Sequence, residues 1–280
     1  MSITIAARGH LSAARPALGA LWPAMVRAGR ALMPLLVMLV LLVGLWQLAA
    51  GRPGSALPAP TKVWADSSDL IIHPFFDHGG LDKGLGLHLF ASLQRVAVGF
   101  ALAAAGGIGL GLLVGTSQIA MRGLDPIFQV LRTVPPLAWL PISLAAFREA
   151  QPSAIFVIFI TAVWPVIINT AVGVRAVPTD YRNVARVIRL RGAKYFLRIL
   201  LPAAAPFIFT VLRIGIGLSW LAIIAAEMLI GGVGIGFFIW DAWNSSNISD
   251  IVVALLYVGL VGFILDRLVA FAGHLVTRGS

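Results

Sequence analysis

The chain of 280 residues lacks cysteine, and only 11% of its residues are charged. The absence of cysteine excludes disulfides, thiolate metal ligands and a cysteine nucleophile. Because 59% of the residues are hydrophobic, too few polar side chains remain to coat a water-soluble globule of this size. The 29 glycines and 16 prolines follow no fixed period, which excludes collagen. The composition therefore predicts an integral membrane protein.

Several kinds of functional site are missing as well. No Gly-Lys-Ser or Gly-Lys-Thr sequence occurs, so the chain has no ATP-binding loop of the Walker type. The five histidines share no helical spacing, and we predict neither a metal site nor a cofactor. The net charge of +10 does not indicate nucleic acid, because basic residues of a membrane protein collect on its cytoplasmic side. Energy for any transport then comes from a partner or an ion gradient.

Charge-free runs locate the membrane spans, because about 20 helical residues cross the hydrocarbon layer. Three runs without charge comprise 21, 26 and 25 residues, at 31–51, 96–121 and 150–174. Three further apolar segments contain isolated ionisable residues: 126–147 with Arg132, 202–229 with Arg213 and Glu227, and 251–274 with Asp266 and Arg267. The sequence thus predicts an all-α, polytopic membrane protein with six transmembrane helices.

The first apolar run, 31–51, has two interpretations. Ala49-Ala50-Gly51 resembles the cleavage site of a secretory signal, but the 30 residues before the run and the run itself are both long for a signal peptide. We expect a first membrane helix. Residues 1–30 carry four arginines and no acid, which suits a cytoplasmic segment on anionic lipid headgroups, with a frayed tail as the alternative.

The charges of the loops indicate the orientation in the membrane. The segment 175–201 holds seven basic residues and one acid, whereas 52–88 holds three basic residues and four acids. Since basic loops remain on the cytoplasmic side, we predict that 175–201 and both termini are cytoplasmic and that 52–88 is external. Proline and glycine in 52–88 favour an ordered loop rather than a domain.

The basic loop 178–201 predicts an amphipathic pair of short helices. Thr179 or Asp180 is suited to cap the first helix, and Gly192 is suited to end it before a second helix reaches Pro202. A loop that only rests on lipid headgroups is the alternative.

Ionisable and helix-breaking residues inside the spans are candidates for a translocation path. Arg213 follows Pro202 by 11 residues, which places it about 16 Å into the bilayer. A charge at that depth needs a partner, so Arg213 is either a cationic station for an anion or half of an ion pair with Asp266. Pro135 and Pro136 cannot both continue a regular helix, which predicts a kinked segment that lines a pore or only packs.

The complete set of path candidates combines these residues with polar and aromatic neighbours. Some of these residues have other interpretations. Arg132 could instead extend its side chain toward the lipid headgroups, and each tryptophan could instead pack against neighbouring helices. Glu227 has three alternatives: it gates the path, contacts a protein that delivers the substrate, or is solvated. The candidates are Arg132, Pro135, Pro136, Trp139, Thr161, Trp164, Asn169, Arg213, Ser219, Trp220 and Glu227.

Residues 90–273 resemble a known family, the permease subunits of binding-protein-dependent ABC importers with the type I fold. The resemblance rests on the runs 91–100, 107–111, 135–141, 212–220, 225–228 and 232–242. In that family a cytoplasmic loop with a Glu-Ala-Ala sequence, a glycine four residues later and a final Leu-Pro docks into the ATPase. Counting back from Leu201-Pro202 puts Asn183-Val184-Ala185 on the Glu-Ala-Ala and Arg189 on the glycine.

The resemblance implies an assembly as well as a fold. It implies a second permease subunit, expected to be an identical copy, two ATP-binding subunits that hydrolyse ATP, and an external substrate-binding protein, all at a bacterial cytoplasmic membrane. The contact with the ATPase is expected at Asp180, Tyr181, Asn183, Val184, Ala185, Arg186, Arg189 and Gly192. Apart from these proteins, only membrane lipids are expected as partners, and no nucleic acid.

The substrate class follows from the same resemblance. The runs around Arg213 and Glu227 look most like those of nitrate permeases, with bicarbonate, cyanate and sulfonate permeases as alternatives. A secondary transporter is the second class and a membrane enzyme the third. An internal repeat is not evident, and no acid, base and nucleophile gather at one membrane depth, which disfavours both.

Overall fold

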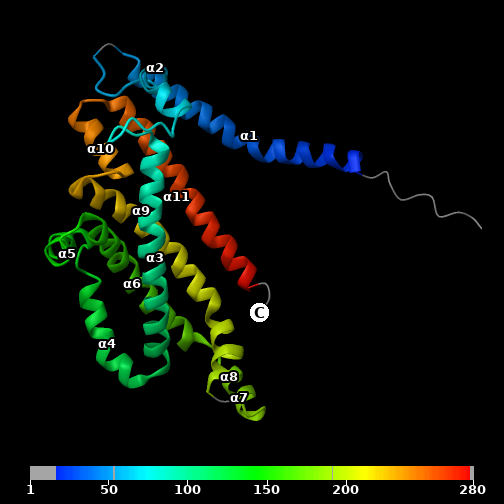
Figure 1. Ribbon diagram of the computed structural model, residues 1–280. Coiled ribbons are helices and arrows are strands. Elements are labelled where there is room, and N and C mark those ends of the chain that lie inside the picture. The colour runs from blue at the N-terminus through cyan, green and yellow to red at the C-terminus, as the bar shows by residue number, and fades with distance from the viewer. Residues whose placement is uncertain (1–16, 53, 191, 278–280) are drawn as a thin grey trace, which may run out of the picture. The chain divides into compact units, whose positions relative to one another are not determined.

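The computed structural model describes residues 17–52, 54–190 and 192–277, and every regular element among them is a helix (Figure 1). The predicted all-α class is therefore confirmed. The elements are α1 (Ala17–Ala50), α2 (Pro60–Ile72), α3 (Leu85–Thr116), α4 (Gln118–Leu131), η1 (Pro136–Trp139), α5 (Leu140–Phe147), α6 (Ala150–Ala176), α7 (Thr179–Val187), α8 (Ala193–Tyr195), η2 (Phe196–Leu200), α9 (Leu201–Ile230), α10 (Ile235–Asn244) and α11 (Ile248–Thr277).

The chain divides into two units between Lys62 and Val63. In the first unit, α1 begins at Ala17 and ends at Ala50, so it contains residues 31–50 of the expected span 31–51 within a longer helix. Its apolar part, Met33–Ala50, has a mean hydropathy of 2.2. Residues 1–16 of the expected basic segment lie outside the described part of the chain. The length and hydropathy of this part suit a membrane helix.

Five of the described helices are long and apolar enough to cross a membrane, and a bent pair makes a sixth. The five are Met33–Ala50, Leu85–Thr116, Ala150–Ala176, Phe196–Ile230 and Ile248–Thr277. The bent pair joins Gln118–Leu131 to Pro136–Phe147 at an angle of 94°. The expected span 126–147 is thus divided into two helices: the first begins earlier, at Gln118, and the chain turns sharply after Leu131.

Two prolines explain the break between α4 and η1. Neither Pro135 nor Pro136 has a backbone N–H, and a proline disfavours the helical conformation of the residue before it. Pro135 accordingly has φ −56° and ψ 132°, outside the α region. The kink predicted from these prolines is present.

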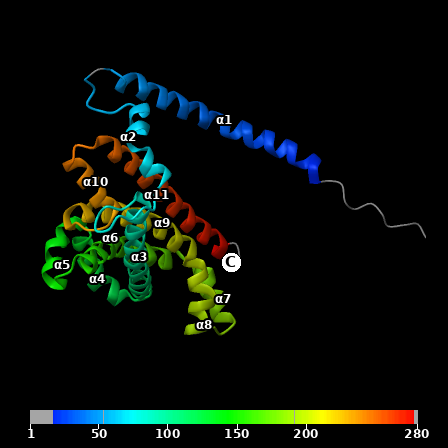
Figure 2. The same ribbon diagram turned by 45° about the horizontal axis from the view of Figure 1, so that its top comes forward.

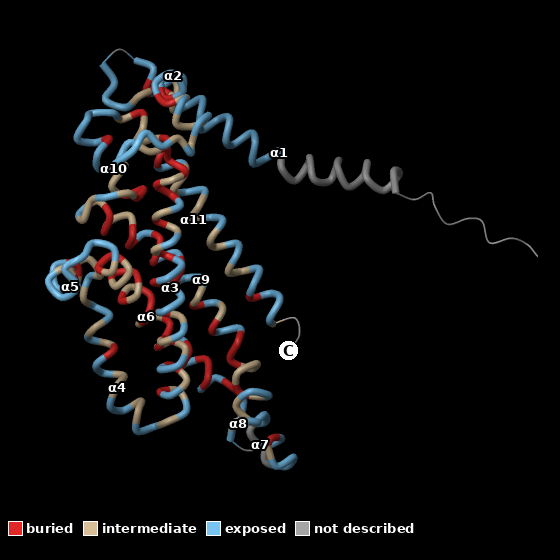
Figure 3. Tube along the Cα trace, viewed as in Figure 1, coloured by how far each residue is buried: buried red, intermediate tan, exposed pale blue. Residues whose placement is uncertain are grey.

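α6 forms the centre of the second unit, where it packs against both α3 and α9. Glycines every fourth residue on α3 permit this approach, since a Cβ at Gly107 would lie 2.7 Å from Val166 Cγ1 and one at Gly111 would lie 2.6 Å from Thr170 Cβ. Buried residues accordingly run along α6, whereas α11 has few (Figure 3).

The segment 52–88 contains α2 and a structured turn. In the second unit, Asp66 accepts a hydrogen bond from Ser249 (2.7 Å) and Ser67 donates one to Asp250 (2.6 Å), which ties α2 to the start of α11. Farther along, the Asp77 carboxylate accepts hydrogen bonds from Lys83 Nζ and from the Gly79 N–H. The Lys83 ammonium and the Gly79 N–H hold the pKa of Asp77 below its ordinary value of 3.8.

Within the second unit, two views place α7 and α8 at the end opposite to α10 (Figures 1 and 2). The loop predicted to be cytoplasmic and α10 therefore lie at opposite ends, with α9 between them along the chain. A single membrane crossing by α9 requires this separation.

Candidate functional site

A cavity of about 290 Å³ lies where the chain breaks between α4 and η1, beside α6. Its lining residues are Arg132, Val134, Pro136, Trp139, Ile160, Thr161, Trp164, Pro165, Ile168, Asn169 and Leu218. Most of them come from the broken segment and from one face of α6, where Thr161, Trp164 and Ile168 follow the helical spacing of three and four residues.

The sequence around the break determines which side chains reach the cavity. α4 ends at Leu131, and Arg132 follows as its C-cap, with a backbone N–H that still bonds to the Phe128 carbonyl (3.0 Å). The prolines then turn the chain, and the 3₁₀ turn of η1 carries Trp139 back to the cavity. A straight helix would place Arg132 and Trp139 seven residues apart along one face, about 10 Å from each other along the axis.

The polar residues that line the cavity differ in whether they have partners. Among the described residues, nothing forms an ion pair or a side-chain hydrogen bond with Arg132. Thr161 donates to the Val157 carbonyl (2.6 Å), and Asn169 donates to the Pro165 carbonyl (2.9 Å). The indole nitrogen of Trp139 also has no hydrogen-bond partner among the described residues, but it is buried and so is not accessible to a solute. The cavity therefore offers a cation to a solute.

The structure brings together six of the residues that sequence reasoning proposed for a path. Arg132, Pro136, Trp139, Thr161, Trp164 and Asn169 line the cavity. Pro135 shapes the turn beside it without lining it. Pro165 is a lining residue that sequence reasoning missed, although a proline inside a span was an available signal.

Arg213 lies elsewhere and has a partner. Its guanidinium forms an ion pair with Asp266 of α11, in which Nη2 is 2.7 Å from Oδ2. Of the two alternatives for Arg213, the ion pair is the one seen in the structure. The pair is only half-buried in this chain, with 48% of the Arg213 side chain exposed.

Ser219 and Trp220 are buried near the middle of α9. The indole N–H of Trp220 donates to the Val258 carbonyl (3.0 Å), so this side chain fastens α9 to α11. Ser219 Oγ has no hydrogen-bond partner among the described residues. Neither residue lines the cavity.

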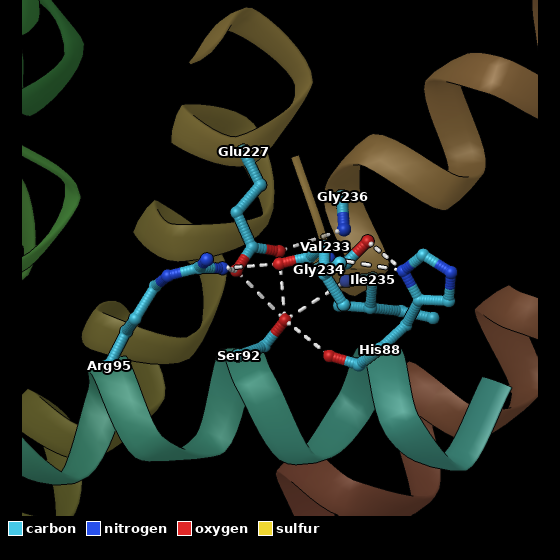
Figure 4. Close-up of polar contacts among 8 residues, drawn as sticks. All are labelled: His88, Ser92, Arg95, Glu227, Val233, Gly234, Ile235 and Gly236. Carbon is cyan, nitrogen blue, oxygen red and sulfur yellow. Dashed lines mark hydrogen bonds and ion pairs between the residues drawn. The ribbon is translucent and has the colours of Figure 1, made fainter. Parts of the chain in front are cut away.

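Glu227 belongs to a second polar cluster, at the outer end of α9 by the predicted topology (Figure 4). Only 1% of its side chain is exposed. Its carboxylate accepts hydrogen bonds from Ser92 Oγ (2.8 Å), Arg95 Nη1 (2.6 Å) and the Gly236 N–H (3.0 Å). Glu227 is therefore not a solvated residue at a helix end.

The same α3 residues also hold the loop that precedes α10. Ser92 Oγ accepts from the Ile235 N–H (2.9 Å), Arg95 donates to the Val233 carbonyl (2.8 Å), and His88 Nδ1 lies 3.1 Å from the Gly234 nitrogen. We call His88, Ser92, Arg95 and Glu227 the clamp. Sequence reasoning missed its three α3 members, although a buried Glu227 required a cationic partner.

The loop 178–201 contains the predicted short helices and presents apolar side chains. Tyr181, Val184, Val187 and Ile188 are each more than half exposed, whereas Ala185 is only 3% exposed. Asp180, Asn183, Arg189 and Gly192 are exposed as well. The side chains of Arg182 and Arg186, and all of residue 191, lie outside the described residues.

The turn after α7 occurs where the family has its glycine. Arg189 has φ 54° and Gly192 has φ 56°, and both values fall in the left-handed region that favours glycine. The Leu190 N–H bonds to the Ala185 carbonyl (2.8 Å) and closes the turn. Arg189, which the resemblance aligns with the family's glycine, thus has the left-handed backbone conformation of a turn.

Comparison with known proteins agrees with this geometry. Residues 107–277 match the family described as the binding-protein-dependent transport system inner membrane component. The chain belongs to this family. It is therefore a multi-pass inner-membrane permease subunit of an ABC importer, and membership implies ATP-binding and substrate-binding partners.

Relatives of this permease carry more specific names. The nitrate import permease protein NrtB of Synechocystis sp. is 65% identical over 243 residues, which cover 87% of this chain and 88% of that protein. The bicarbonate transport system permease protein CmpB of Synechococcus elongatus is 53% identical over 250 residues, which cover 88% and 90%.

A solved structure supports the fold of the permease. A chain of the MetNI methionine ABC transporter, in an inward-facing conformation, aligns with a TM-score of 0.58 at 18% identity. The alignment covers 76% of this chain and 97% of that chain. It confirms the type I ABC importer permease fold predicted from the sequence.

Proposed function

We propose that this permease moves nitrate into the cell as one of two identical membrane subunits, driven by two ATP-hydrolysing subunits and supplied by an external binding protein. The observation that carries the substrate is a comparison within one organism. NrtB of Synechocystis sp. is 65% identical to this chain, whereas CmpB of the same strain is 50% identical. Bicarbonate is the second candidate, because in Synechococcus elongatus the corresponding values are 54% and 53%.

The loop 178–201 is the proposed contact with the ATPase subunits. Its exposed apolar side chains lie at the end opposite to α10 and have no covering element in the described part of this chain. Apolar side chains of this kind are suited to insert into a cleft of a partner. In this arrangement both termini are cytoplasmic, and α10 is on the side of the binding protein.

The function is tested with the complete complex in sealed proteoliposomes. With ATP inside and the binding protein outside, we expect uptake of isotopically labelled nitrate that exceeds uptake of labelled bicarbonate and does not fall when an ionophore removes ion gradients. A non-hydrolysable ATP analogue is the control and should stop uptake. Faster uptake of bicarbonate would support the second candidate, and uptake that needs a gradient but no ATP would contradict an ABC importer.

A further inference from the structure

We propose that the cavity beside the α4 and η1 break is an anion station of the permease, where the Arg132 guanidinium holds a small planar oxyanion. This inference rests on the proposed function, and it assigns the transported ion to a site inside the membrane subunit. It also moves the expected cationic contact from Arg213 to Arg132.

Charge distinguishes the two arginines. Arg213 is already neutralised by Asp266, whereas the described residues that line the cavity contain Arg132 and no carboxylate. Arg132 is exposed in this chain, so its guanidinium is accessible to water and to an ion in the cavity. A mobile anion there supplies a counter-charge, and a planar guanidinium suits the oxygens of a planar oxyanion.

The size of the cavity and the chemistry of its walls favour transient rather than tight binding of an ion. At about 30 Å³ per water, 290 Å³ has room for roughly nine or ten waters, so a four-atom oxyanion fits with part of its hydration shell. The remaining walls include the rings of Trp139 and Trp164, which offer little else to an anion. An ion in transit has to leave again, and one cationic side chain with apolar walls permits that.

The cysteine-free chain allows a direct test of the station. In the assembled complex, Thr161→Cys places one thiol in the cavity, and Asn169→Cys is the second position if the first variant does not assemble. The thiol is treated with two methanethiosulfonates of similar size, one with a sulfonate and one with a trimethylammonium group. We expect the anionic reagent to react faster, and we expect nitrate, but not sodium gluconate, to slow the reaction.

Variants then identify the groups responsible. Arg132→Gln should reduce the ratio of anionic to cationic labelling roughly tenfold and abolish protection by nitrate, because the local positive charge is lost. Arg122→Gln removes a charge from the same helix outside the cavity and should change neither result.

The outcomes separate the station from the proposed function. If nitrate is transported but neither protects the thiol nor depends on Arg132, the cavity holds water only and the station is wrong. If the complex transports bicarbonate instead, and bicarbonate protects the thiol through Arg132, the substrate is wrong and the station stands. Equal labelling by the two reagents in the parental complex would overturn the proposal.

Discussion

Arg213 donates to both carboxylate oxygens of Asp266, although 53 residues separate them along the chain. The pair links α9 to α11 within segments that are long and apolar enough to span the membrane. A guanidinium with both of its partner's oxygens engaged has little capacity left for a transported ion. Arg213 therefore serves to hold α9 against α11.

This ion pair predicts that a double variant recovers part of the stability that each single variant loses. Asp266→Asn or Arg213→Gln alone leaves one charge without its partner, so each should lower the thermal stability of the detergent-purified permease. The double variant has no unpaired charge and should recover part of the loss. Thermal melts followed by size-exclusion chromatography measure this, and losses that simply add in the double variant would argue against the pair. If Arg213→Gln leaves stability intact but stops uptake, Arg213 contacts the ion after all.

The sequence predicted the helices well because membrane spans are set by length and hydropathy, which are local properties. It also predicted the break near Pro135 and Pro136, since proline acts on its own backbone. The partner of Arg213 was among the alternatives because an intramembrane charge demands one.

The clamp could not be predicted in the same way. Ser92 and Glu227 are 135 residues apart, and their contact depends on how α3, α9 and the loop before α10 are packed together. Hydropathy says nothing of that packing. The absence of a carboxylate among the residues that line the cavity with Arg132 likewise depends on the packing of the helices.

The turn around Asp77 should depend on pH. Its pKa is lowered in the folded protein by Lys83 and the Gly79 N–H, so the stabilisation is present above the ordinary value of 3.8 and is lost as the pH falls through the lower, folded value. Hydrogen exchange at Gly79 should therefore accelerate in strong acid beyond its intrinsic pH dependence. Asp77→Asn should show the faster exchange already at neutral pH, and an unchanged rate in that variant would contradict the contact.

The contact between α3 and α6, called the seam below, predicts that two nearby glycines of α3 differ in how much stability changes when each is replaced by alanine. A Cβ at Gly107 would meet Val166 Cγ1 at 2.7 Å and the Val163 carbonyl at 3.2 Å, whereas nothing described lies within 4 Å of a Cβ at Gly109. Gly107→Ala should cost about 1–3 kcal/mol through overpacking. Gly109→Ala should be neutral or stabilising by up to about 1 kcal/mol. Equal stabilities, measured by thermal or denaturant unfolding, would show that the seam tolerates a methyl group.

The loop 178–201 predicts that a substitution on its exposed face prevents binding of the ATPase subunits without lowering the stability of the permease. Val187 is 82% exposed, so Val187→Asp should leave the permease as stable as the parent but prevent the ATPase subunits from co-purifying. Ala185 is buried in the permease alone, so Ala185→Asp should already lower the stability of the isolated permease by several kcal/mol. Normal assembly and uptake in the Val187 variant would remove this face of α7 from the proposed contact.

The clamp predicts that one added methyl group will detach α10 from α3. A Cβ at Gly234 would lie 2.5 Å from Glu227 Oε2 and 2.6 Å from Oε1, so Gly234→Ala forces the carboxylate away from Ser92 and Arg95. Its φ of 171° is open to any residue, so the effect comes from the clash and not from the backbone. Breaking one side of a buried ion pair costs about 3–5 kcal/mol, and we expect a loss of that order in Gly234→Ala.

The control is Gly217→Ala in α9, because a Cβ there meets no described atom within 4 Å. Unfolding measurements compare the two variants with the parent, and hydrogen exchange at Ile235 reports on the clamp itself, since its N–H bonds to Ser92 Oγ. Faster exchange at Ile235 in Gly234→Ala, without change in α6, would place the damage at the clamp. Parental exchange in that variant would mean that Glu227 has another position in which it still holds the loop.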